Sequence, residues 1–127
     1  MSEEAEVLKA RSMTFALNVC ALIKRLPRDE PGMTVRRQLA KSSTSVAFNY
    51  RASCRARSHG EFTAKIGVVA EESDETLGWL EFVEAAKLLP TVDMSRVVQE
   101  ARELAAIFSA SYGTARRKRR DDDGNSR

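Results

Sequence analysis

Apolar residues recur along the chain at spacings of three and four, the period of an amphipathic helix that buries one face. Proline and glycine interrupt this pattern between Pro27 and Gly32, at Gly60 and at Pro90. The sequence therefore predicts four helices separated by short linkers. Their expected ranges are about 2–26, 33–57, 59–89 and 92–113.

The short linkers indicate how these helices are connected. A linker of a few residues cannot cross the length of a bundle, so consecutive helices must be antiparallel. Apolar spacing close to 3.5 residues favours nearly parallel axes with a slight left-handed twist. Glycine, proline and aromatic residues are scarce, which is typical of helical proteins. We predict an all-α, up-down-up-down, left-handed antiparallel four-helix bundle over residues 1–113.

The second predicted helix has two distinct faces when plotted at 100° per residue. Small and apolar residues lie within about 40° of one direction and should form its core face. They are Val35, Leu39, Ser42, Val46, Tyr50 and Ser53. The opposite direction carries Arg37, Lys41, Thr44, Phe48, Arg51 and Arg55. This second group places a phenylalanine in the middle of a basic stripe.

Three explanations of Phe48 remain open from the sequence. The stripe of Arg37, Lys41, Arg51 and Arg55 could bind RNA or DNA, with the ring stacking on a base. Phe48 could instead be the buried anchor of a subunit contact whose rim is basic. The third explanation is an exposed cation–π arrangement without further consequence.

Charge is distributed unevenly along the body of the chain. Residues 1–67 contain 12 basic and 6 acidic residues, whereas residues 68–115 contain 3 and 9. An antiparallel hairpin would bring Lys41 level with Glu75, and Arg37 level with Glu81. We therefore expect ion pairs between the second and third helices to neutralise part of the basic stripe.

Polar residues at the edge of the core face suggest a buried hydrogen-bond cluster. Asn49 lies at this edge next to Tyr50 of the core face, and Ser73 or Thr76 of the third helix are possible partners. We interpret these four residues as a structural cluster that specifies helix register rather than as a ligand site. Ser58 and Glu61 have the spacing of a capping box at the start of the third helix.

No motif of a catalytic, metal or cofactor site is present. The acidic run Glu71–Glu75 resembles part of a di-iron site, but such a site needs Glu-x-x-His pairs, and His59 is the one histidine. Cys20 and Cys54 lie far apart, with no pattern of a zinc site or a disulfide framework. We expect a protein that is not an enzyme and that has neither metal nor cofactor.

The two ends of the chain differ in charge. The acidic start and the absence of an apolar run of about 20 residues predict a soluble, cytoplasmic protein without a membrane span. Residues 114–127 combine six basic and three acidic residues without an apolar anchor. We expect this tail to be disordered and solubilising, although its basic cluster could add nonspecific affinity for nucleic acid.

Four motifs resemble the "four helix bundle protein" family, which is encoded in intervening sequences of bacterial 23S ribosomal RNA genes and is also labelled as S23 ribosomal proteins. They are R-Q-L at Arg37–Leu39, S-x-S-V-x-x-N-Y at Ser43–Tyr50, S-x-x-E-F at Ser58–Phe62 and E-x-x-D-E-T-x-x-W-L-E at Glu71–Glu81.

The resemblance implies a homopentamer of left-handed bundles with no known catalytic activity. Together with the basic stripe, it leads us to expect an oligomeric accessory or adaptor protein that binds RNA or DNA. Related proteins include the accessory variability determinant of diversity-generating retroelements, a pentamer that binds nucleic acid and a reverse transcriptase. The alternatives are therefore this retroelement role, with a reverse transcriptase as partner, and a purely structural or protein-binding pentamer.

Overall fold

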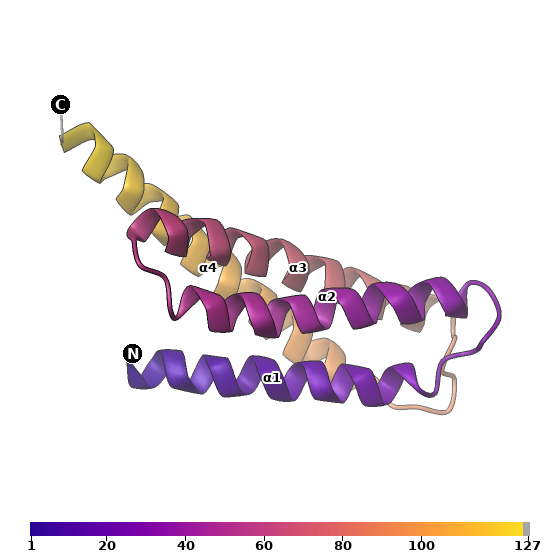
Figure 1. The fold of residues 1–127 in the computed structure, drawn as a ribbon. Helices are drawn as coiled ribbons and strands as arrows, with labels where there is room; N and C mark the ends of the chain where they lie inside the picture. The colour runs from indigo at the N-terminus through magenta and orange to yellow at the C-terminus, as the bar shows by residue number, and fades with distance from the viewer. Residues whose placement is uncertain (126–127) are drawn as a thin grey trace.

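The computed structural model describes residues 1–125, which form four helices and no strand (Figure 1). They are α1 (Glu3–Ile23), α2 (Gly32–Ser53), α3 (His59–Ala85) and α4 (Ser95–Asn125). Consecutive helices run antiparallel. The predicted all-α four-helix bundle is therefore confirmed.

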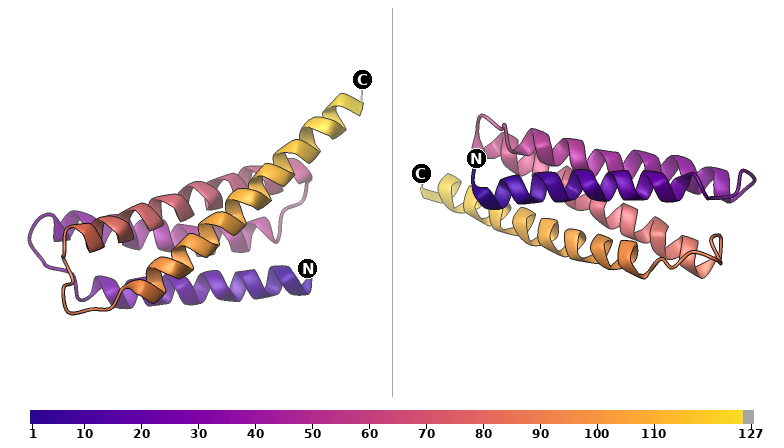
Figure 2. Two further views of the ribbon diagram at one scale, coloured as in Figure 1. Left: turned by 180° about the vertical axis from the view of Figure 1, so that it is seen from behind. Right: turned by 90° about the horizontal axis from the view of Figure 1, so that it is seen from below.

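The helices do not contact one another equally. α2 packs between α1 and α3, and α3 also packs against α4, whereas α1 and α4 meet over a short stretch. Figure 2 shows α4 starting beside the end of α1 and then crossing obliquely away from it. The divergence leaves an open cleft of about 760 Å³ whose apolar lining includes Phe15, Leu22 and Val97.

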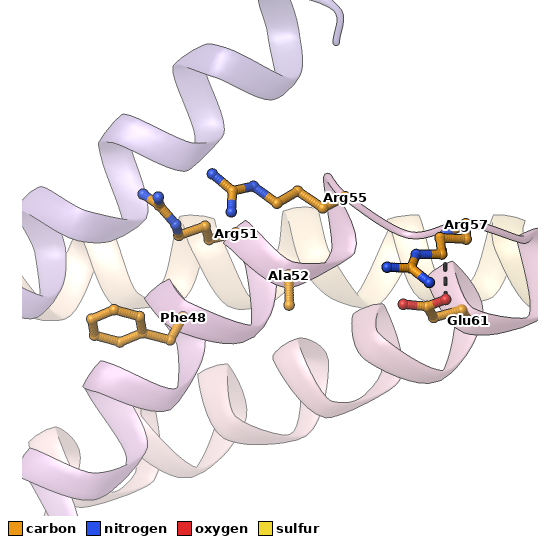
Figure 3. A pocket seen from close by; sticks show the side chains of 6 residues that line it. All are labelled: Phe48, Arg51, Ala52, Arg55, Arg57 and Glu61. Atoms are coloured by element: carbon orange, nitrogen blue, oxygen red, sulfur yellow. Dashed lines mark hydrogen bonds between the residues drawn. The ribbon is translucent and has the colours of Figure 1, made fainter.

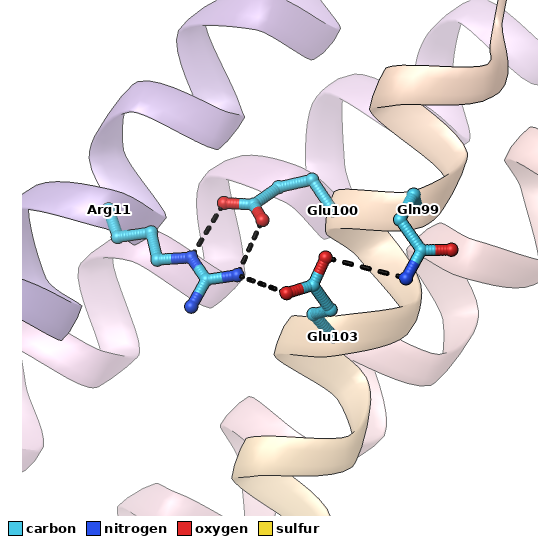
Figure 4. Close-up of polar contacts among 4 residues, drawn as sticks. All are labelled: Arg11, Gln99, Glu100 and Glu103. Atoms are coloured by element: carbon cyan, nitrogen blue, oxygen red, sulfur yellow. Dashed lines mark hydrogen bonds and ion pairs between the residues drawn. The ribbon is translucent and has the colours of Figure 1, made fainter.

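One side chain of α1 connects it to α4 across this cleft. The Arg11 guanidinium donates to both carboxylate oxygens of Glu100, at 2.8 and 2.6 Å, and to Glu103 at 3.3 Å (Figure 4). The hydrogen bond to Glu100 is the main cause of a raised pKa at Arg11. Bidentate arginine–carboxylate geometry is the strong form of a surface ion pair.

The core is formed by the stripes that the apolar pattern predicts. Val35, Leu39 and Val46 of α2 are fully buried, as are Val69 and Leu80 of α3. The small side chains predicted on the core face of α2 are also buried and let α3 approach closely. They are Ser42, which contacts the buried Thr76 of α3, and Ser53, whose hydroxyl donates to the Tyr50 carbonyl.

The helix starts are stabilised by local hydrogen bonds. Ser58 Oγ accepts from the Glu61 N–H at 3.0 Å, as the capping-box spacing predicts. The Glu61 carboxylate turns back to the Arg57 N–H, at 3.3 Å, rather than to that of Ser58. At the start of α2 the Glu30 carboxylate accepts from the Thr34 N–H and hydroxyl, and these bonds lower the pKa of Glu30.

The expected disorder of residues 114–127 is wrong for residues 114–125, because α4 continues to Asn125. Contacts with α3 explain the difference. The Tyr112 ring lies against Gly67, Ala115 is buried, and the Ala115 carbonyl is 2.9 Å from His59 Nε2. These contacts hold the helix past residue 113, where the sequence predicted its end. Residues 126 and 127 lie outside the described part of the chain.

Gly32 provides a test of the linker between α1 and α2. A Cβ at Gly32 would lie 2.3 Å from the Pro27 carbonyl oxygen, so Gly32→Ala must displace backbone. We expect a loss of roughly 1–3 kcal/mol of unfolding free energy, as for other overpacked sites. Urea unfolding followed by circular dichroism measures it.

The matched control is Gly113→Ala in α4, where the one nearby group is the flexible end of Arg117. Alanine has the higher helix propensity, so this variant should gain roughly 0.5–1 kcal/mol. Equal stability of the two variants would contradict the steric role of Gly32.

Candidate nucleic-acid interface

The exposed face of α2 carries a shallow hollow next to an exposed aromatic ring. Phe48 is 60% exposed, an unusual fraction for a residue of its size and polarity. The hollow has a volume of about 420 Å³ and lies where α2 ends and α3 begins (Figure 3). It is lined by Phe48, Arg51, Ala52, Arg55, Arg57 and Glu61.

Helix geometry explains why these residues meet. Phe48 and Arg51 are three residues apart and share one face of the end of α2, and Arg55 follows in the turn directly after the helix. α2 ends at Ser53, and the chain then turns so that Arg57 and Glu61 close the other side of the hollow. In Figure 3 the Arg51 and Arg55 side chains extend to the same side of α2.

The hollow has a strong excess of positive charge. Its one carboxylate, Glu61, already accepts a backbone hydrogen bond. Arg51, Arg55 and Arg57 form no ion pair with any carboxylate among the described side chains, where the pairs found involve Lys9, Arg11 and Arg102. Three guanidinium groups beside an exposed ring are therefore available to an anionic ligand.

The expected ion pairs between α2 and α3 are wrong. Glu81 lies 3.7 Å from Arg102 of α4 instead of pairing with Arg37. The carboxylate close to Lys41 is that of Glu72, whose pKa is raised chiefly by burial and lowered in part by this lysine. Among the described side chains, Arg37, Arg51 and Arg55 thus have no ion pair with an acid of α3, and Glu72 is the acid of α3 that interacts with Lys41.

The structure brings together part of the predicted basic stripe. Phe48, Arg51 and Arg55 line the hollow, whereas Arg37 and Lys41 are exposed on the same face farther along α2. At 1.5 Å per residue, Lys41 is about 10 Å and Arg37 about 16 Å from Phe48 along the helix axis. They can extend a ligand's path but do not line the hollow.

Arg57 was missed because the predicted helix continued to residue 57, where 100° per residue places Arg57 opposite Phe48, whereas α2 ends at Ser53. The available signal was its position directly before Ser58, the cap of α3. A residue there must project from the α2–α3 turn.

The predicted hydrogen-bond cluster of Asn49, Tyr50, Ser73 and Thr76 is also wrong. Asn49 bonds back along its own helix to the carbonyl and hydroxyl of Ser45. Thr76 Oγ1 donates to Ser42 Oγ at 2.8 Å. Ser42 lies about two helix turns before Asn49 and Tyr50, the expected partners of Thr76. Ser73 Oγ is buried without a partner among the described residues, and Tyr50 packs on the Phe108 ring at 5.1 Å between centroids. Register is instead specified by the Ser42–Thr76 contact.

Comparison with protein families decides what kind of bundle this is. The family model for the 23S rRNA-intervening sequence protein matches residues 3–110, which is most of the chain. The chain belongs to this family. The match includes α1, α2, α3 and the first half of α4, and it ends before the basic residues that close α4.

A solved structure shares the fold of this family member. It is a protein of unknown function from the S23 ribosomal protein family of Bacteroides thetaiotaomicron VPI-5482, with a TM-score of 0.75 and 23% identity over 86% of this chain and 97% of that one. None of the curated proteins compared with the sequence matches it.

Over the described residues, no helix is long and apolar enough to cross a membrane. The retroelement role stays a prediction.

Tyr50, buried on the core face of α2, gives a pH-dependent prediction. Burial raises its pKa to about 12 from an ordinary value of 10.0. A raised pKa in the folded state means that the unfolded chain releases this proton first, so stability is lost as pH rises from about 10 to 12. Tyr50→Phe should reduce this alkaline loss, measured by thermal unfolding between these pH values. An identical pH profile in both proteins would contradict the assignment.

Proposed function

We propose that this protein is a non-enzymatic, oligomeric adaptor that binds nucleic acid, RNA in the first place, through the outer face of α2. The observation that carries the proposal is the exposed Phe48 ring bordered by Arg51, Arg55 and Arg57, which lack carboxylate partners within the described part of the chain. Guanidinium groups bind phosphates, and an exposed ring offers a stacking platform for one unpaired base.

The rest of the face supports the same ligand. Arg37 and Lys41 are exposed in line with the hollow, so a strand leaving it along α2 would meet two more cations. A polyanion gains from such a row because each neutralised phosphate releases counterions. A small anionic metabolite would not need a row of this length.

The first test is the salt dependence of RNA binding. Arg51→Ala/Arg55→Ala should weaken binding of a labelled single-stranded RNA for every sequence. Because a single strand contributes a slope of roughly 0.7 per phosphate contact, the slope of log affinity against log salt should fall by roughly 1.4. Fluorescence anisotropy at several salt concentrations measures both quantities.

The matched control is Arg25→Ala/Arg28→Ala, which removes the same charge from exposed positions at the opposite end of the bundle. It should leave affinity and slope nearly unchanged. If the two double variants lose affinity equally, binding depends on net charge alone and the proposed site is wrong.

A second candidate function is a protein-binding pentamer in which Phe48 is a subunit contact. The observation that favours it is Gly78, an exposed glycine in the middle of α3 with nothing within 4 Å of a Cβ placed there. Glycine costs about 1 kcal/mol relative to alanine in a helix interior, and contacts within this chain do not explain it.

The surroundings of Gly78 complement the basic face of α2. Trp79 and Phe82 form an edge-to-face pair at 5.8 Å beside it, and Glu75 and Glu81 are exposed nearby. Phe48 of a second copy could occupy this bare position with its arginines facing the acids. Such a contact is head-to-tail and generates a ring when the rotation closes, which fits the homopentamer that the family resemblance implies.

Light scattering tests this second candidate. Phe48→Asp should convert the assembly into monomers, whereas Leu17→Asp, at a 64% exposed site on α1, should leave it intact. If Phe48→Asp keeps the full assembly, Phe48 is not a subunit contact, and its side chain in the wild type is free to stack on a base.

A further inference from the structure

The last part of α4 forms an arm that projects past the beginning of α3 (Figure 1). Three contacts hold its base against α3. The Tyr112 ring packs on Gly67, the Ala115 carbonyl is 2.9 Å from His59 Nε2, and the Arg119 guanidinium packs on Gly60. Both glycine contacts are close, because an added Cβ would lie 2.9 Å from the Tyr112 ring at Gly67 and 3.3 Å from the Arg119 guanidinium at Gly60. The arm is therefore positioned by the first turns of α3.

The arm is strongly basic where it meets α3. Five consecutive cations follow the buried Ala115, all of them exposed. They are Arg116, Arg117, Lys118, Arg119 and Arg120. None forms an ion pair with a carboxylate of residues 1–121. The three aspartates of the chain end come after them, at 121–123, so the positive charge is concentrated at the base of the arm.

The arm and the hollow on α2 meet at the start of α3. Arg57 of the hollow is three residues before Gly60, and Gly60 is the residue against which Arg119 lies. The N-terminus of α3 between them adds the positive end of its helix dipole. Arg51, Arg55 and Arg57 thus join the five arm residues in one band of eight exposed cations around this end of the bundle.

The two halves of the band differ in what they can bind. The hollow offers the Phe48 ring, which can stack on a base only if that base is unpaired. The arm offers no exposed ring, because Tyr112 lies on Gly67 and under Arg116, whose guanidinium carbon is 4.9 Å from the ring centroid. Cations at every 100° around a helix suit the phosphates of a duplex, which need no base contact.

We propose that the arm is a second half of the nucleic-acid site, and that the ligand class is structured RNA in which a duplex flanks an unpaired base. The duplex phosphates bind the five cations of α4, and the unpaired base binds at Phe48. This inference rests on the proposed function of the hollow. The family match ends at residue 110, so the arm is a property of this chain outside the matched region.

The test compares three RNAs on the whole 127-residue chain: a stem-loop, its stem as a blunt duplex, and its loop as a single strand. The variant replaces Arg116, Arg117, Lys118, Arg119 and Arg120 with glutamine, which keeps helix propensity and removes charge. Anisotropy should show that the wild type prefers the stem-loop. In the variant, affinity for the stem-loop should fall at least about tenfold and its salt slope by roughly 3 to 4, with single-strand affinity within about twofold of wild type.

Two controls keep the inference falsifiable. A variant with Lys at Arg116, Arg117, Arg119 and Arg120 keeps the charge and should keep stem-loop binding, and circular dichroism checks that helix content is unchanged. An unchanged stem-loop affinity in the glutamine variant, or equal losses on the stem-loop and the single strand, overturns the inference. The proposed function fails separately, when Arg51→Ala/Arg55→Ala leaves single-strand binding intact.

Discussion

The close approach of α2 and α3 is the constraint on which the rest of the structure depends. Small buried side chains at Ser42 and Thr76 let the two helices meet, with their hydroxyl oxygens 2.8 Å apart. A buried hydroxyl pair is stable only when both groups find partners, so this contact specifies one register. On the other side of α2, Arg36 donates to the carbonyls of Ile23 and Leu26 at the end of α1. With α2 held from both sides, its third face must point to solvent.

This arrangement also determines which charges are neutralised. Among the described side chains, the ion pairs between helices are made by α4, from Glu100 and Glu103 to Arg11 of α1 and from Arg102 to Glu81 of α3. Exposed pairs contribute about 0 to 1 kcal/mol each, so they orient α4 more than they stabilise it. The cations at the end of α2 and on the arm have no ion pair with any carboxylate of residues 1–121. Both groups lie at the same end of the bundle because α2 and α4 each finish there.

The sequence predicted the fold well because helical periodicity is a local property. The buried stripe from Val35 to Ser53, the cap at Ser58 and the exposure of Phe48 all follow from spacing within one helix. Contacts between helices could not be predicted in this way. Asn49 was expected to bond to α3 but bonds to Ser45 of its own helix. Arg57 lines the hollow from the turn between α2 and α3. The end of α4 was missed because it is held by His59 and Gly67, about 50 residues earlier in the chain.

The most direct test asks what covers the ring at position 48. Phe48→Trp in a Trp79→Phe background places the one tryptophan of the chain at this site. The account predicts that its fluorescence in the free protein is that of a solvent-exposed indole and that a stem-loop RNA quenches it as a base stacks on the ring. Emission of a buried indole without RNA, or no quenching at saturating RNA, would contradict the account.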